Sequence, residues 1–131
     1  MIQELKIKVL AIGCETMLNR LSARLDEDAF SLRTCSSHEG VRDLLQQEPF
    51  DVVIIDDLFN DTAQLCRDAS RAGPAPVAVL CRCSLTDWRK FGRLEVDGFF
   101  PDEAGAGELM ARVKAFSRRK LLSPQPARTT G

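Results

Sequence analysis

The sequence predicts an α/β domain: a doubly wound, five-stranded parallel sheet whose strands alternate with single helices, written (βα)5. Two patterns support this prediction. Short apolar runs rich in β-branched residues are too short for helices and are typical of buried parallel strands. Between them, apolar residues recur at the spacing of amphipathic helices. Because crossovers between parallel strands are right-handed, we expect helices on both faces of the sheet.

Five segments have the composition of strands. Ile7–Ile12, Val52–Ile55 and Val77–Leu80 are apolar and rich in β-branched residues, and Gly98–Phe100 is a weaker run of the same kind. Phe30–Cys35 alternates apolar and polar residues, which is typical of an edge strand. We therefore expect three buried strands, a weaker fourth and one edge strand.

Five segments have helical periodicity. Met17, Leu18, Leu21 and Leu25 form one apolar stripe within residues 16–25. The other predicted helices cover residues 39–47, 61–72, 85–94 and 108–120. We expect residues 1–120 to form one domain. Residues 121–131, which contain Ser, Pro and Gly, are expected to be a linker or tail that leads to an output domain outside this chain.

Composition and charge exclude several classes of protein. Hydrophobic residues make up 44% and charged residues 28%, as in ordinary globular domains. A formal net charge of −1 provides no general basic field for nucleic acid or a membrane surface. No run approaches the ~20 apolar residues that cross a bilayer, and the amino terminus lacks the apolar core of a signal peptide. We expect a cytoplasmic protein.

Cysteine usage indicates reduced thiols. An odd number of cysteines without an export signal does not predict a disulfide framework. The closest pair, Cys81 and Cys83, does not form a CxxC motif, and His38 is the one histidine. A zinc site therefore has little support. We interpret most cysteines as small buried apolar side chains. The five are Cys14, Cys35, Cys66, Cys81 and Cys83.

Polar residues follow the predicted strands at the edge where such sheets bind ligands. In chain order they are Gly13-Cys14-Glu15, Asp56-Asp57, Cys81-Arg82-Cys83 and Pro101-Asp102-Glu103. A carboxylate after four apolar residues, as at Asp56, must lie at the rim of the sheet, because burial without a partner is costly.

The chain resembles the response-regulator receiver family, the CheY-like domains. The resemblance spans about residues 6–120 and rests on motif residues and on the spacing between motifs. The matching segments are Asp51–Asp56, Pro76–Leu80, Val96–Phe100 and Glu108–Ala115. It implies a flavodoxin-like fold and a role in bacterial two-component signalling, with a histidine kinase or an output domain as partner.

The resemblance also implies a chemistry, from which this chain departs. In the family an Asp, here Asp56, accepts a phosphoryl group, and an acidic pair after the first strand helps to bind Mg²⁺. A Thr or Ser after the fourth strand and a Lys after the fifth hold the phosphoryl group. In this chain the acidic pair falls on Gly13 and Cys14, the hydroxyl position on Cys81 and the Lys position on Asp102.

These departures predict a degenerate receiver, or pseudo-receiver, that binds partners and is not an enzyme. Exchanging an ammonium for a carboxylate turns attraction to phosphate into repulsion, each contact being about 4 kcal/mol at ~4 Å and an effective dielectric of ~20. We expect no required cofactor and weak Mg²⁺ binding. If missing side chains alone silence the site, Gly13→Asp, Cys14→Asp, Cys81→Thr and Asp102→Lys together should restore modification.

Three interpretations of Asp56 stay open. It is a carboxylate that caps the following turn or helix, a working acceptor with an atypical metal shell, or part of a cation site with Glu15, Asp57 and Asp102. The second defines the alternative function, a phosphoacceptor modified by a histidine kinase. Arg82 either pairs with Asp56 or Asp102 in place of the missing cation or is a solvated loop residue.

Other family positions concern the output. Phe99 matches the family's switch aromatic, although a core Phe is the alternative. Asp97, Glu108 and Arg112 match part of the charged face by which receivers of winged-helix regulators dimerise, but Gly98 replaces a second Asp. The resemblance therefore implies a homodimer through helix 4, strand 5 and helix 5.

Overall fold

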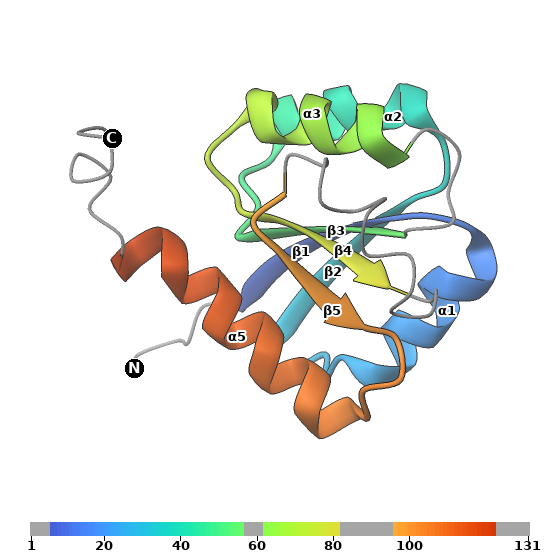
Figure 1. The fold of residues 1–131 in the computed structure, drawn as a ribbon, viewed down its shortest axis with the longest axis vertical. Coiled ribbons are helices and arrows are strands. Elements are labelled where there is room, and N and C mark those ends of the chain that lie inside the picture. The colour runs from blue at the N-terminus through green and yellow to red at the C-terminus, as the bar shows by residue number, and fades with distance from the viewer. Residues whose placement is uncertain (1–5, 57–61, 82–95, 123–131) are drawn as a thin grey trace.

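The computed structural model describes residues 6–56, 62–81 and 96–122, which form a parallel sheet with helices on both faces (Figure 1). All five strands belong to one sheet in the order β2-β1-β3-β4-β5, and every neighbouring pair is parallel. The predicted doubly wound α/β fold is confirmed. The strands are β1 (Ile7–Ile12), β2 (Phe30–Cys35), β3 (Val52–Asp56), β4 (Val77–Cys81) and β5 (Gly98–Pro101).

The strand predictions agree closely with the structure. β1 and β2 have the predicted bounds, and β3, β4 and β5 each extend one residue further at the carboxyl end. β2 lies at the edge of the sheet, as its alternating sequence predicted. β3 is buried along its whole length, as expected for a strand covered on both faces.

Four helices are described, and they divide between the two faces of the sheet. α2 and α3 cover one face, and α1 and α5 cover the other (Figure 1). The helix predicted over residues 85–94 lies outside the described residues. Leu121 and Leu122, predicted to begin the linker, belong to the last helix. The helices are α1 (Glu15–Arg24), α2 (His38–Gln47), α3 (Thr62–Ala72) and α5 (Ala106–Leu122).

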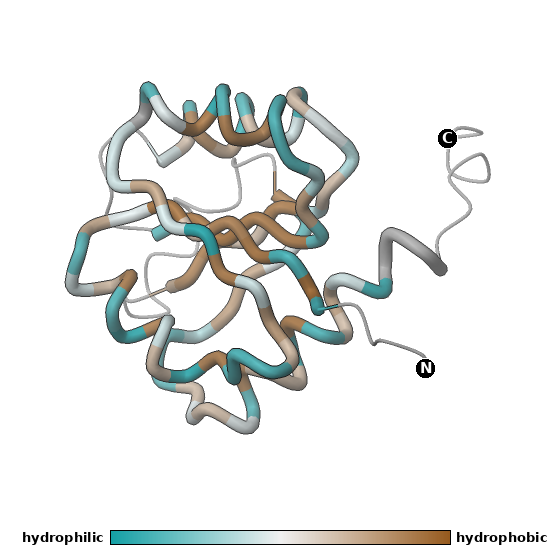
Figure 2. Tube along the Cα trace, turned by 180° about the vertical axis from the view of Figure 1, so that it is seen from behind, coloured by the Kyte–Doolittle hydropathy of each residue, from teal (hydrophilic) through white to brown (hydrophobic). Residues whose placement is uncertain are grey.

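The core consists of two apolar clusters separated by the sheet. One cluster joins α1 and α5 to the sheet through residues such as Leu21 and Leu109, and the other joins α2 and α3 through Val41 and Leu65. Figure 2 shows the strands as the most hydrophobic part of the chain, with hydrophilic residues along the outer helices. Each fully buried side chain of this size contributes about 1.5–3 kcal/mol.

Two aspartates form the same pair of hydrogen bonds with a neighbouring strand, near the amino-terminal ends of β3 and β5. Asp51 Oδ2 accepts the Lys8 N–H at 2.9 Å, and the Asp51 N–H donates to the Lys8 carbonyl at 2.8 Å. Asp97 and Val77 repeat this exchange, with both distances 2.8 Å. These pairs therefore help to fix the register of β3 on β1 and of β5 on β4. One carboxylate oxygen of Asp97 is used in a hydrogen bond within the sheet.

In the parts of the chain that the structure describes, no helix is long and apolar enough to cross a membrane. In these same parts, no disulfide joins any two of Cys14, Cys35, Cys66 and Cys81.

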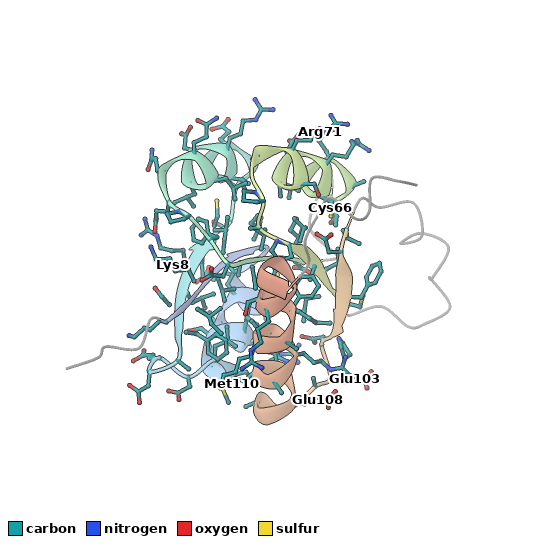
Figure 3. The ribbon with its side chains drawn as sticks, turned by 90° about the vertical axis from the view of Figure 1, so that its left-hand side faces the viewer. Lys8, Cys66, Arg71, Glu103, Glu108 and Met110 are labelled. Carbon is teal, nitrogen blue, oxygen red and sulfur yellow. The ribbon has the colours of Figure 1, made fainter. Side chains whose placement is uncertain are left out.

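The buried thiol of α3 predicts a dependence of stability on alkaline pH. Cys66 lies on the sheet-facing side of α3 (Figure 3), and burial raises its pKa from 9.0 to about 12, partly offset by Arg67. Between these two pH values the unfolded chain loses the thiol proton and the folded chain keeps it, so the free energy of unfolding falls as the pH rises. Wild type should therefore lose up to about 1.4 kcal/mol more per pH unit than Cys66→Ala.

Urea denaturation across this pH range, with a reductant present, measures the two slopes. Cys66→Ala also removes buried volume, which lowers its stability at every pH and leaves the comparison of slopes intact. Equal slopes for the two proteins would contradict the prediction.

Candidate functional site

The carboxyl ends of the central strands bring the predicted site residues to one edge of the sheet. Ile12 of β1 is in register with Ile55 of β3, so Gly13 and Asp56 follow on neighbouring strands. On the other side, Asp56 is in register with Leu80, which places Cys81 one residue beyond it on β4. The predicted meeting of these strand ends is therefore present in the fold.

Asp56 is completely buried at the end of β3. Its Oδ2 accepts a long hydrogen bond of 3.5 Å from the Cys14 N–H at the start of α1. Its backbone carbonyl accepts the Thr62 hydroxyl at 3.0 Å, which connects the end of β3 to the start of α3. The carboxylate thus faces the junction of β1 with α1.

Gly13 fills this junction because a larger residue has no room there. A Cβ at Gly13 would lie 2.6 Å from Asp56 Cβ and 2.6 Å from Met17 Cε. Real Cβ atoms essentially never approach so closely, and Asp56 Cβ is fixed to the central strand. The family's acidic side chain does not fit at Gly13 in this packing. This packing opposes the expectation that Gly13→Asp would help to restore modification, because Asp56 or the end of β1 would have to shift first, and the expectation stays a prediction.

Asp102 turns toward α1 and forms ion pairs there. Its carboxylate lies 2.7 Å from Arg20 Nη1 and 3.2 Å from Arg24 Nη2, and the residue is 8% exposed. We expected Asp102 to add negative charge beside Asp56, but two guanidinium groups compensate that charge. The lysine position of the family is occupied here by the anionic member of an ion-pair cluster.

The other described candidates, Glu15, Cys14 and Cys81, do not converge on a site for Mg²⁺. Glu15 is exposed in the first turn of α1, and Cys14 is partly buried against the α1 and α5 side of the core. Cys81 directs its thiol to the Val79 carbonyl at 3.9 Å. Within residues 6–56, 62–81 and 96–122, no three acidic, His or Cys side chains converge on a metal-sized site. Mg²⁺ prefers oxygen ligands in octahedral geometry, so these residues do not fit it.

The predicted output positions lie on β5 and α5. Phe99 is partly buried against the α2 and α3 side of the core, so the core interpretation and the switch role both stay predictions. Gly98 faces α5, where a Cβ would lie 2.8 Å from Phe116 Cε1. Arg112 Nε donates to Glu108 Oε2 at 2.9 Å on the exposed side of α5. Figure 3 shows Glu108 at the end of the molecule where β5 leads into α5.

Several sequence predictions concern residues outside the described ranges. These are the contribution of Asp57 to a cation site, the two interpretations of Arg82, and Cys83.

Sequence reasoning missed three residues that contact the site: Arg20, Arg24 and Thr62. One signal for the first two was available. Arginines at positions i and i+4 share one side of a helix, so Arg20 and Arg24 on α1 can reach the same anion. Nothing in the sequence identifies that anion, because Asp102 is 78 residues away from Arg24.

Solved structures with this arrangement include receiver domains. The response regulator receiver domain protein (CheY-like) from Methanospirillum hungatei JF-1 has a TM-score of 0.74 at 12% identity, covering 89% of this chain and 98% of that chain. Response regulator DrrB, a Thermotoga maritima OmpR/PhoB homolog, has a TM-score of 0.69 at 22% identity, covering 88% of this chain and 54% of that chain.

A third similar structure contains a metal ion. The receiver domain of sensor histidine kinase PA1611 from Pseudomonas aeruginosa PAO1 has magnesium coordinated in its active-site cleft. Its TM-score is 0.65 at 9% identity, covering 86% of this chain and 98% of that chain. No protein-family model and no curated protein sequence matches the chain. The chain therefore has the CheY-like receiver fold.

The close packing at Gly13 predicts a selective loss of stability. Gly13→Ala should lower the free energy of unfolding by about 1–3 kcal/mol, because the added methyl group meets Asp56 and Met17. Gly107→Ala is the matched control, since a Cβ there meets no atom within 4 Å. It should be neutral or slightly stabilising in α5. Urea denaturation followed by circular dichroism compares the variants, and a Gly13→Ala protein as stable as wild type would contradict the packing argument.

Proposed function

We propose that this chain is a degenerate receiver domain of a two-component phosphorelay, which regulates partner proteins by binding them. In this proposal phosphorylation of Asp56 is impaired or absent. The observation that carries it is the packing at Gly13, where the family's metal-binding side chain has no room beside Asp56. The receiver fold supports the pathway, and the site residues support the loss of the chemistry.

The electrostatics of phosphoryl transfer support the same proposal. A transferred phosphoryl group spreads negative charge over its oxygens, and catalysis depends on cations held near them. Asp102 stands at the family's lysine position and supplies no ammonium. Among the described residues, Arg20 and Arg24 form ion pairs with the Asp102 carboxylate. We infer that Mg²⁺ binds weakly and that a phosphoryl group on Asp56 would lack its usual counter-charges.

The alternative function is a phosphoacceptor with an atypical metal shell, modified at Asp56 by a histidine kinase. The position of Asp56 at the carboxyl end of β3, within a receiver fold, favours it. The complete burial of that carboxylate opposes it, because an acceptor must meet its phosphodonor. A direct phosphorylation experiment separates the two functions.

The partners in this proposal are a histidine kinase or an output domain. DrrB offers a precedent for the latter, since the matched region is 54% of its chain. We infer no direct contact of this domain with nucleic acid, because its formal net charge is −1. We also place the domain in the cytoplasm, where two-component relays operate.

Acetyl phosphate tests the state of Asp56. Wild-type protein incubated with acetyl phosphate and Mg²⁺ should gain no phosphoryl mass by intact-mass spectrometry, because the counter-charges for the phosphoryl group are missing. An active receiver treated in parallel confirms that the reagents work, and Asp56→Asn is the site control. Phosphoryl mass that appears on wild type and is absent from Asp56→Asn would establish the alternative function.

We also propose self-association through α5 and β5, which Arg112 can test. Arg112 and Glu108 are about half exposed on α5, with side-chain exposures of 48% and 54%. If Arg112 meets an acidic group of a second copy, Arg112→Glu should raise the dimer dissociation constant by up to about fivefold, the range of exposed ion pairs. Sedimentation equilibrium measures the constant.

Lys114→Glu is the matched control for this experiment, because it makes the same change of charge at another exposed position of α5. The two substitutions should differ if Arg112 makes a specific contact. Equal effects, or a wild-type protein that remains monomeric at high concentration, would remove the proposed interface.

A further inference from the structure

Arg24 uses all three of its side-chain nitrogen atoms in hydrogen bonds. Nη1 donates to the backbone carbonyls of Asp102 at 2.9 Å and Ala104 at 3.1 Å, and Nη2 donates to Asp102 Oδ1 at 3.2 Å. Nε donates to the Arg20 carbonyl at 3.2 Å. The Arg24 side chain is 14% exposed, and it connects α1 to the loop that follows β5.

Arg20 completes the connection from one turn earlier on α1. Its Nη1 lies 2.7 Å from Asp102 Oδ2, so each carboxylate oxygen of Asp102 has its own guanidinium partner. Charge-assisted hydrogen bonds of this kind are about twice as strong as neutral ones. They are also stronger where water is partly excluded, and the Asp102 side chain is 10% exposed.

The loop from Asp102 to Gly105 joins β5 to α5, and its backbone is tied at both ends. The Asp102 N–H donates to the Cys81 carbonyl at 2.9 Å, and the Leu109 N–H donates to the Gly105 carbonyl at 2.9 Å. Between them, the Ala104 N–H donates to the Pro101 carbonyl at 3.2 Å. The Arg24 contacts to Asp102 and Ala104 thus hold the centre of the loop against α1, on the face that α1 shares with α5 (Figure 1).

We propose that Arg20, Arg24 and Asp102 form an internal clasp that keeps the β5–α5 loop and the start of α5 in one position. The clasp supplies a cation–anion pair at the family's lysine position without any phosphoryl group. Its signalling meaning rests on the proposed function: the loop keeps one position without any phosphoryl group on Asp56. Arg24 acts here as a positioning residue, because it works through the loop backbone.

Amide hydrogen exchange followed by NMR tests the clasp on the intact, unmodified chain. In Arg24→Met, exchange at the Asp102 and Ala104 amides should accelerate by about tenfold or more relative to a β1 amide such as Leu10, because local opening no longer breaks a buried ion pair. Arg24→Lys should rescue little, since one ammonium cannot reproduce the forked contacts with two carbonyls and a carboxylate. Arg33→Met is the control, because it removes a partly exposed ion pair with Glu48, between β2 and the end of α2, away from the loop.

The reference to a β1 amide separates local opening from a general loss of stability. If Arg24→Met does not fold, Asp102→Asn provides the same test with a side chain of nearly equal size. Exchange at the loop amides within twofold of wild type, in whichever of these variants folds, would overturn the clasp. Full rescue by Arg24→Lys would overturn the role given to the forked guanidinium.

Acetyl phosphate with Mg²⁺ distinguishes failure of the clasp from failure of the proposed function. Loop exchange in wild type should be the same with and without the reagent. If Asp56 gains phosphoryl mass while loop exchange is unchanged, the proposed function fails and the clasp stands. If phosphorylation alters loop exchange, the permanent position assigned to the loop is overturned as well.

Discussion

The parallel sheet is covered on both faces, and this constraint organises the rest of the molecule. β3 lies in the middle of the sheet with every residue buried, and helices close both sides of it. A chain with such a centre can place polar groups only where strands end, because an unpaired buried charge is costly. Asp56, the last residue of β3, therefore lies where the apolar core ends and the polar strand-end site begins. Its carboxylate depends on what the end of β1 and the start of α1 provide.

The buried carboxylates of Asp56 and Asp102, at that edge of the sheet, are stabilised in two different ways. Beside Asp56, the end of β1 lies so close that a side chain at Gly13 has no room. There the Cys14 N–H donates to the Asp56 carboxylate. Beside Asp102, two long cationic side chains reach across from α1 and neutralise the carboxylate. Both solutions stabilise buried acidic groups from within the protein. Within the described residues, neither brings together three acidic, His or Cys side chains that could hold a metal ion for phosphoryl transfer.

The same fold carries different residues at its strand ends. A similar structure from Pseudomonas aeruginosa coordinates magnesium in its cleft, although it shares 9% of its residues with this chain. Fold and strand order survive such divergence because they depend on apolar patterning, whereas a metal site depends on a few individual oxygen atoms. The proposed function of this chain therefore rests on Gly13, Asp56 and Asp102 and not on the fold.

The sequence by itself determined the strands, the alternation with helices and the position of Asp56, because apolar periodicity and β-branched composition act locally. It also identified Gly13, Cys14, Cys81 and Asp102 as departures from the receiver pattern. Only the tertiary structure decided what those departures do. The space available for a side chain at Gly13 is set by the spacing of two strands. The partners of Asp102 lie on α1, and one of them, Arg24, is 78 residues away in the sequence. Such contacts depend on how the crossovers bring distant segments together. Local sequence patterns do not predict which distant residues will meet.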